Sequence, residues 1–176
     1  MFFSVESKLE DIYKMVLREF VLEDKGRLLE ILNDSDVTKY LSTKISQPYT
    51  SEDADWWITE GSKLSLVRAI EVDEKLVGCI GVNRGEFEYC RSGEIGYWLA
   101  SDFWRRGIAT NAINEMLLEV FLTTDIIRIF ASVFDGNVGS MKVLEKCGFA
   151  FEAIQPKAIF KENTFYDSHV FAIQKT

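Results

Sequence analysis

Histidine, cysteine and long apolar runs are scarce in this 176-residue chain, and each shortage argues against a class of protein. His169 is the only histidine, which weakens any Ser-His, Cys-His or histidine-rich metal site. Cys79, Cys90 and Cys147 contain no C-x-x-C spacing and are odd in number, which argues against a zinc site or a disulfide framework. We therefore expect no metal, and a reducing, cytoplasmic location.

No apolar run approaches the roughly 18 residues that a membrane span requires. The first residues, MFFSVESKLEDIY, are acidic early and lack the basic start of a secretory signal. Excess positive charge is also missing, because the formal net charge is −8. This balance argues against nucleic-acid binding, which draws affinity from neutralised phosphates. It suits a cationic partner, although acidity also serves solubility alone.

Almost half of the residues are hydrophobic, and no repeat, low-complexity tract or Pro/Gly/Ser linker interrupts them. A chain of this length buries enough surface for one core. We therefore predict a single domain over residues 1–176.

Hydrophobic periodicity gives the order of elements. Strands are expected at 14–21, 64–72, 75–83, 86–100 (one strand or two), 126–134, 149–154 and 168–175, and helices at 22–34, 51–63 with Ser51 as N-cap, about 107–121, and 137–148. This order predicts a mixed α/β (α+β) domain with an antiparallel first half and a βαβ crossover in the second.

The stretch YWLASDFWRRGIAT joins the end of a strand near Ala100 to a helix that begins near Gly107. The first N–H groups of a helix have no internal partners and carry the positive end of its dipole, so they form a ready anion site. Gly107 lets the backbone approach a ligand, and Arg105 and Arg106 add phosphate donors. The alternative is an ordinary basic loop. Walker A and G-x-G-x-x-G patterns are both missing.

The succession GEIGYWLASDFWRRGIATNAINEML and IIRIFASVFDGNVGSMKVLEKCGF resembles the acetyl-CoA-binding core of the GNAT N-acetyltransferases, and more narrowly their Rim-type branch. The opening VLREFVLEDKGRLLEILNDSDVTKYL is similar to the start of that branch. The resemblance implies a single GNAT-like domain, with a mixed, mostly antiparallel sheet flanked by helices and a βαβ core that holds acetyl-CoA.

The resemblance also implies how the cosubstrate is held. The family's pyrophosphate loop falls on Trp104, Arg105, Arg106, Gly107, Ile108 and Ala109, with Thr110 following. Trp104 departs from the usual Arg or Gln, but backbone donors do not depend on that side chain. The pantetheine arm would pair with the strand edge at Trp98, Leu99 and Ala100, since its amides can extend a sheet. Asn137 resembles a side-chain contact to this arm, with a plain helix N-cap as the alternative.

Direct attack of an amine on a thioester needs a base and stabilisation of the oxyanion and the leaving thiolate. Glu94 is the candidate base, on a half-buried strand face shared with Gly96 and Trp98; the alternative is a solvated face without function. Ser140 lies on the inward stripe of its helix and is the candidate donor near the sulfur, or else bonds its own helix. The resemblance places Leu144 at a position where many family members have a tyrosine that acts as the general acid.

Three interpretations remain open. The first is an N-acetyltransferase acting on a primary amine, either a protein N-terminus or a small and possibly cationic molecule. The second is a non-catalytic acyl-CoA sensor, and a nucleotide-binding loop is a third. Trp56, Trp57, Tyr166 and His169 are expected to serve packing more than substrate. Either a monomer or a homodimer is compatible with the sequence.

Overall fold

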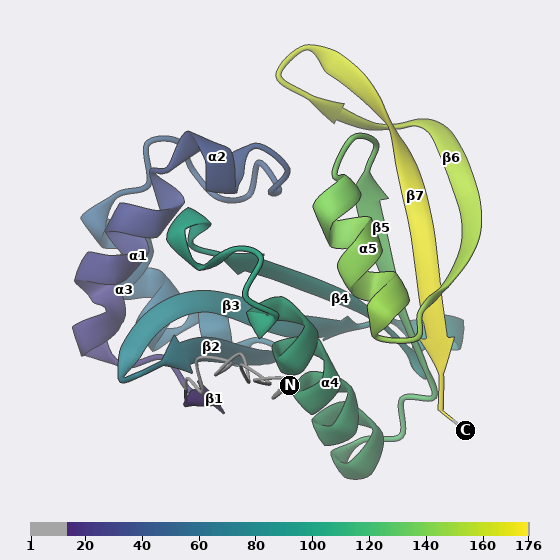
Figure 1. Cartoon of the computed structure of the whole chain (residues 1–176), viewed down its shortest axis with the longest axis horizontal. Coiled ribbons are helices and arrows are strands. Elements are labelled where there is room, and N and C mark those ends of the chain that lie inside the picture. Colours follow the sequence, from purple (N-terminus) through teal and green to yellow (C-terminus); the bar gives the residue numbers. More distant parts are fainter. Residues whose placement is uncertain (1–13, 176) are drawn as a thin grey trace, which may run out of the picture.

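A seven-stranded sheet forms the middle of the protein, in a computed structural model that describes residues 14–175 (Figure 1). The predictions about a secretory signal and about the outermost residues of the 1–176 domain concern residues 1–13 and 176, outside the described part. The strands and helices are β1 Met15–Arg18, α1 Lys25–Leu32, α2 Ser35–Thr38, α3 Ser51–Thr59, β2 Leu66–Val72, β3 Lys75–Arg84, β4 Ser92–Leu99, α4 Ile108–Thr123, β5 Arg128–Phe134, α5 Val138–Lys146, β6 Ala150–Lys161 and β7 Thr164–Gln174.

The strand order is β1-β2-β3-β4-β5-β7-β6. Among the strand pairs of residues 14–175, β4–β5 alone is parallel, and α4 makes the crossover between these two strands. This confirms the predicted mixed, mostly antiparallel sheet with a βαβ unit. Every helix among residues 14–175 is too short or too polar to cross a membrane.

Helices cover both faces of the sheet, and each face has its own core (Figure 1). The apolar stripe of α4, including Ile113 and Met116, packs with Leu144 of α5 against one face. Helices α1 and α3 cover the other face through side chains such as Leu28 and Ile58. The predicted apolar stripe of α4 explains why the helix packs on this face of the sheet, because its apolar residues are shielded from water in that contact.

The two faces of β4 divide as strand alternation predicts. Ile95, Tyr97 and Leu99 belong to the core under α4 and α5, whereas Trp98 packs on the side of α1 and α3. Glu94 shares that second face, because it is an even number of residues from Trp98.

Several boundary predictions were wrong. Thr50, not Ser51, caps α3: its hydroxyl accepts from the Asp53 N–H at 3.2 Å, and Asp53 accepts from the Thr50 N–H. Both residue types cap helices well, so the pattern alone did not decide between them. The stretch 86–100 holds a 3-10 turn at Phe87–Tyr89 and one strand. Aromatic content indicated strand there, yet Phe87 is 82% exposed and has φ of +50°.

The last two strands are longer than predicted. They continue into a hairpin whose turn, Glu162 and Asn163, has positive φ at both residues. Most of β6 is exposed to solvent. It therefore lacks the alternation of apolar and polar residues by which a half-buried strand is predicted. Helix α2, capped by Asp34, was also missed, because four residues are too few to show a helical period.

Candidate functional site

The turn before α4 leaves backbone donors open at the helix start. Gly107 has φ of +77°, a left-handed conformation that L side chains disfavour, and it provides no side-chain cap. The first hydrogen bond of the helix runs from the Asn111 N–H to the Gly107 carbonyl at 3.1 Å. The N–H groups of 108–110 therefore precede the helical ladder, at the positive end of a 16-residue helix. An anion fits this site.

The three residues before Gly107 have separate environments. The Trp104 indole N–H donates to the Leu99 carbonyl at 3.0 Å, which fixes the loop to the end of β4. Arg106 donates to the Asp102 carbonyl at 2.7 Å, and its guanidinium lies 4.9 Å from the Phe103 ring centroid. Arg105 is exposed, with φ of +62°. The sequence did not show that Trp104 has a polar partner.

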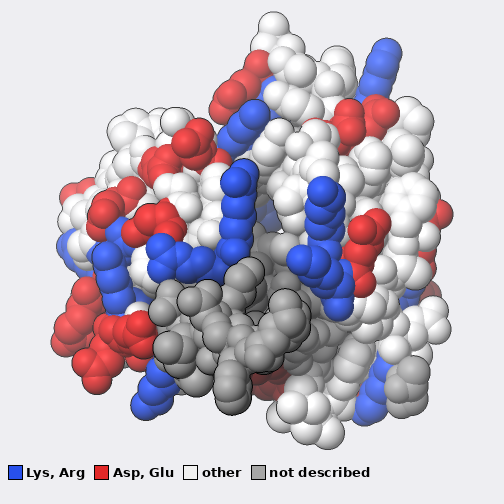
Figure 2. All heavy atoms as spheres, viewed as in Figure 1, with Lys and Arg blue, Asp and Glu red and all other residues white. Residues whose placement is uncertain are grey.

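Basic side chains gather around this helix start despite the acidic composition. Arg105 and Arg106 precede α4, and Lys142 and Lys146 are exposed on the neighbouring α5. Figure 2 shows lysine and arginine side chains clustered near the centre of the view, where α4 begins and α5 lies in Figure 1. The local positive charge favours an anionic ligand here, although the chain as a whole is negatively charged.

The sheet opens next to this loop, between β4 and β5. Their pairing runs only from Ser92↔Arg128 to Glu94↔Phe130. Beyond Glu94, β4 keeps β3 as its strand neighbour among the described residues, while β5 pairs with β7. The edge of β4 beyond Glu94 is thus available to a ligand with amide groups, apart from the Leu99 carbonyl, which already accepts from the Trp104 indole, and the Trp98 carbonyl, which is directed at Gly78 of β3. The Ala100 N–H is not, because it donates to the Val77 carbonyl at 2.8 Å.

Glu94 lies at the point where the two strands separate. Its side chain is half-buried, and two residues further along the same face Gly96 borders open space, since a Cβ there would meet nothing within 4 Å. A carboxylate beside an unfilled volume can accept a proton from a group that enters it, directly or through water.

Helix α5 places two predicted residues in its first turn. The Asn137 side chain caps the helix by accepting from the Ser140 N–H at 3.3 Å. The Ser140 hydroxyl lies 2.6 Å from the Tyr97 hydroxyl of β4, so the two side chains form a pair across the α4–α5 side of the sheet. Sequence reasoning missed Tyr97. Strand alternation did place it on the face of the core, and that was the only signal for it.

Other residues singled out in the sequence are structural or peripheral. Leu144 is fully buried and fills the core, and Cys147 is also buried, where burial raises its thiol pKa. Trp57 packs edge-on against Phe20 with ring centroids 5.9 Å apart, while Trp56 is half exposed. His169 lies 3.4 Å from Asp135. Residues 14–175 contain no group of three or more His, Cys, Asp and Glu side chains suited to a metal.

The hairpin of β6 and β7 is tied to the loop after α2. Lys161 is buried, and its ammonium donates to the carbonyls of Thr38, Lys39 and Leu41 at 2.8–2.9 Å. An aromatic series adds to this contact: Tyr40, Phe134 and Tyr166 follow one another with ring centroids 5.9 and 5.5 Å apart. Segments distant in sequence are therefore joined at the end of β5 beyond the opening (Figure 1).

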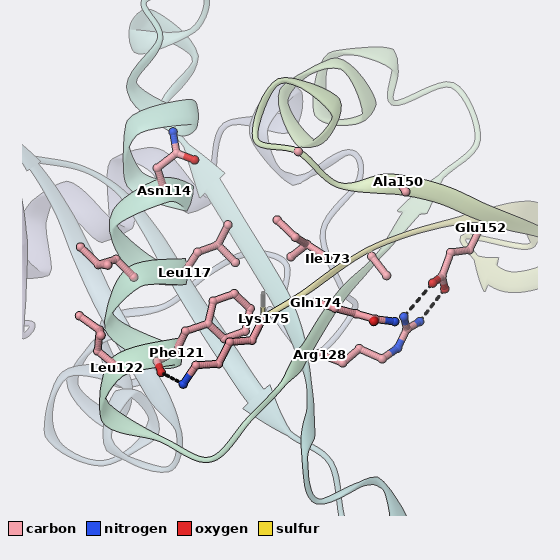
Figure 3. A pocket seen from close by; sticks show the side chains of 13 residues that line it. Asn114, Leu117, Phe121, Leu122, Arg128, Ala150, Glu152, Ile173, Gln174 and Lys175 are labelled. Atoms are coloured by element: carbon pink, nitrogen blue, oxygen red, sulfur yellow. Dashed lines mark hydrogen bonds and ion pairs between the residues drawn. The ribbon is translucent and has the colours of Figure 1, made fainter.

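A separate open groove of about 780 Å³ lies between the second half of α4 and the strands β5, β6 and β7. The ion pair between Arg128 and Glu152 closes one side of it, and Lys175 bonds the Phe121 carbonyl (Figure 3). None of the predicted site residues lines this groove, and it lacks an open helix start. The anion site and the Glu94 region therefore belong to a different part of the surface.

Comparison with known proteins agrees with this geometry. A family model for the acetyltransferase (GNAT) domain matches residues 14–150. The uncharacterized N-acetyltransferase YnaD of Bacillus subtilis is 29% identical over 165 residues, covering 91% of this chain and 93% of that protein. A GNAT-family acetyltransferase of Bacillus anthracis has a TM-score of 0.80 at 27% identity, over 92% of this chain and 95% of that one.

A Rim-type enzyme shares the fold as well. RimJ of Mycobacterium smegmatis, solved in complex with CoA-disulfide, has a TM-score of 0.79 at 24% identity, over 91% of this chain and 81% of that one. The resemblance to the GNAT family that the RRGIAT and LEKCGF stretches suggested is thereby confirmed. For the Rim-type branch, the agreement is one of fold. The chain belongs to the GNAT acetyltransferase family and is an N-acetyltransferase.

Proposed function

We propose that this protein transfers the acetyl group of acetyl-CoA directly to a primary amine, held with the cosubstrate in one complex. The observation that carries the proposal is the opening between β4 and β5 beside the uncapped start of α4. A diphosphate on the N–H groups of 108–110 would direct the pantetheine arm along the free edge of β4. The GNAT family uses acetyl-CoA, and these residues suit its anionic and amide groups.

The two faces of β4 supply different chemistry at this opening. Glu94 lies on the face toward α1 and α3, whereas Tyr97 and Ser140 lie on the face toward α5. An acetyl thioester in the opening would meet an amine and its base from one face, and a hydroxyl donor for the sulfur from the other. The new N–C bond forms as the C–S bond breaks, so no enzyme nucleophile is required.

The acceptor is an exposed amine of a protein N-terminus or a small molecule. The net charge of −8 favours a cationic acceptor, because a field of opposite sign raises its local concentration. All three cysteines are free, which supports the expected cytoplasmic setting.

The test is acetyl transfer from acetyl-CoA to a panel of N-terminal peptides, polyamines and amino acids. Release of the CoA thiol is measured as the readout. Cys90 is free and exposed and is expected to react with thiol reagents too, so the Cys90→Ser protein is the reference. Transfer to at least one amine is expected. Thermal stabilisation by CoA with no release of thiol on any amine would favour the acyl-CoA sensor. Stabilisation by ATP at least as strong as by CoA would favour a nucleotide site.

Glu94→Gln tests the base separately. General-base catalysis contributes about 10²- to 10⁴-fold, so kcat is expected to fall about 100-fold or more while the Kd for CoA stays within about twofold. Glu115→Gln on the exposed face of α4 is the matched control and is expected to retain the wild-type rate. A wild-type rate in Glu94→Gln would remove this residue from the mechanism.

A further inference from the structure

The Tyr97 hydroxyl is the one polar group that β4 extends toward the first turn of α5 among the described residues of these two elements. It lies 2.6 Å from the Ser140 Oγ and 3.4 Å from the Ser140 carbonyl oxygen. The ring is partly buried and packs against the core under α4 and α5. Helix α5 contains no tyrosine, and Leu144, one turn after Ser140, is fully buried and has no acidic proton. The phenol near Ser140 therefore comes from β4.

We propose that Tyr97 is a positioning residue for Ser140: its O–H donates to the Ser140 Oγ, so that the serine proton is free to point at the departing sulfur of the thioester. This inference rests on the proposed acetyl transfer.

The count of protons supports this direction of donation. Each hydroxyl of the pair has one proton, so one of them must accept when the other donates. If Ser140 donated to Tyr97, the acceptor left for the phenol proton among the described residues would be the Ser140 carbonyl at 3.4 Å, beyond the usual 2.5–3.0 Å of an O–H···O bond. If Tyr97 donates, both protons are used once negative charge develops on sulfur, and the chain of two hydrogen bonds is polarised in one direction.

The pair stabilises the thiolate without giving up a proton. Burial raises the pKa of Tyr97 to about 12, whereas a thiol has a pKa near about 8.5. A thiolate of that basicity does not remove a proton from such a phenol. The electron pair of the broken C–S bond therefore stays on sulfur, the two hydroxyls keep their protons, and the amine proton leaves through Glu94 or water on the other face. The thiolate is protonated later by solvent.

Kinetics test the coupling between the two hydroxyls. One hydrogen bond of ordinary strength corresponds to about tenfold, and removal of a donor at a developing charge to about 100-fold. Tyr97→Phe is expected to lower kcat about tenfold and Ser140→Ala about 100-fold, with KM and the Kd for CoA within about twofold. The double variant is expected to match Ser140→Ala, because Tyr97 acts only through the serine. A product of the two losses, or wild-type kcat in Tyr97→Phe, would overturn the proposal.

A second measurement needs no activity and keeps the proposal testable if acetyl transfer itself is wrong. In the Cys90→Ser background, Ser140→Cys places a thiol next to Tyr97, and the pH dependence of its alkylation gives its pKa. Adding Tyr97→Phe is expected to raise that pKa by about one unit, since a hydrogen bond to the thiolate is lost. Tyr89→Phe, at an exposed position, is the control without effect. Equal pKa values with and without the phenol would show that Tyr97 does not donate to this position.

Discussion

Gly107 offers the sharpest perturbation of the anion site, because any L residue there brings both strain and a side chain to the first N–H groups of α4. Its φ of +77° lies in the left-handed region. An L residue in that conformation costs about 1 kcal/mol, which corresponds to a roughly fivefold effect if it is expressed entirely in binding. Gly107→Ala measures the effect of this strain and of one methyl group, without a charge.

Gly107→Glu adds a carboxylate at the place where we expect a diphosphate. At about 5 Å and an effective dielectric constant of about 20, two like charges repel by about 3 kcal/mol. Since about 1.4 kcal/mol is a factor of ten, the Kd for CoA is expected to rise at least about 100-fold beyond that of Gly107→Ala. The new carboxylate also competes for the N–H donors, because the helix start favours any negative charge.

Calorimetric titration of CoA into wild type and both variants measures the effect at low ionic strength, where screening is weakest. Circular dichroism melts control for folding. The reasoning is refuted if Gly107→Glu binds CoA within twofold of Gly107→Ala, since the diphosphate would then bind elsewhere.

Three further predictions concern the support of the site. Lys161→Met removes a charged donor from three carbonyls and should lower the free energy of unfolding by about 3 kcal/mol and speed hydrogen exchange after α2, whereas exposed Lys157→Met should do neither. Gly78→Ala should destabilise by about 2 kcal/mol in urea unfolding, because its Cβ would lie 2.4 Å from a β4 carbonyl oxygen; Gly96→Ala, which meets open space, should cost far less, and equal losses would contradict the packing. Burial raises the pKa of Tyr97 from 10.0 to about 12, so between these pH values unfolding releases the phenol proton and the free energy of unfolding falls by about 1.4 kcal/mol per pH unit. Tyr97→Phe should show a shallower fall over this pH range, and a slope identical to wild type would contradict the burial of this hydroxyl.

The sequence predicted the central elements because their signals are local. The apolar stripe of α4 and the apolar strand 126–134 lie in the core that they indicate. Asn137 caps α5, as its residue type predicted, and Gly148 follows the end of this helix with φ of +85°. The boundaries failed where the determinant is tertiary. The outer part of β6 is strand because β7 pairs with it, and its own residues show no buried face.

The candidate site divides in the same way. Gly107 and Glu94 are recognisable from a turn next to a helix and from strand alternation. The contact between Tyr97 and Ser140 joins residues 43 positions apart, and the Lys161 contacts span more than 100, so no periodicity reveals them. Trp104 departs from the family pattern in sequence, and only the structure shows that its indole binds the Leu99 carbonyl.

The most direct measurement is a crystal structure with CoA and a non-reactive amine bound together. We expect the diphosphate on the N–H groups of 108–110, the pantetheine arm against the free edge of β4, the sulfur within hydrogen-bond reach of the Ser140 hydroxyl, and the amine on the Glu94 side of the strand. A coenzyme seated in the groove between α4 and β7, with the opening beside β4 left unfilled, would contradict the account.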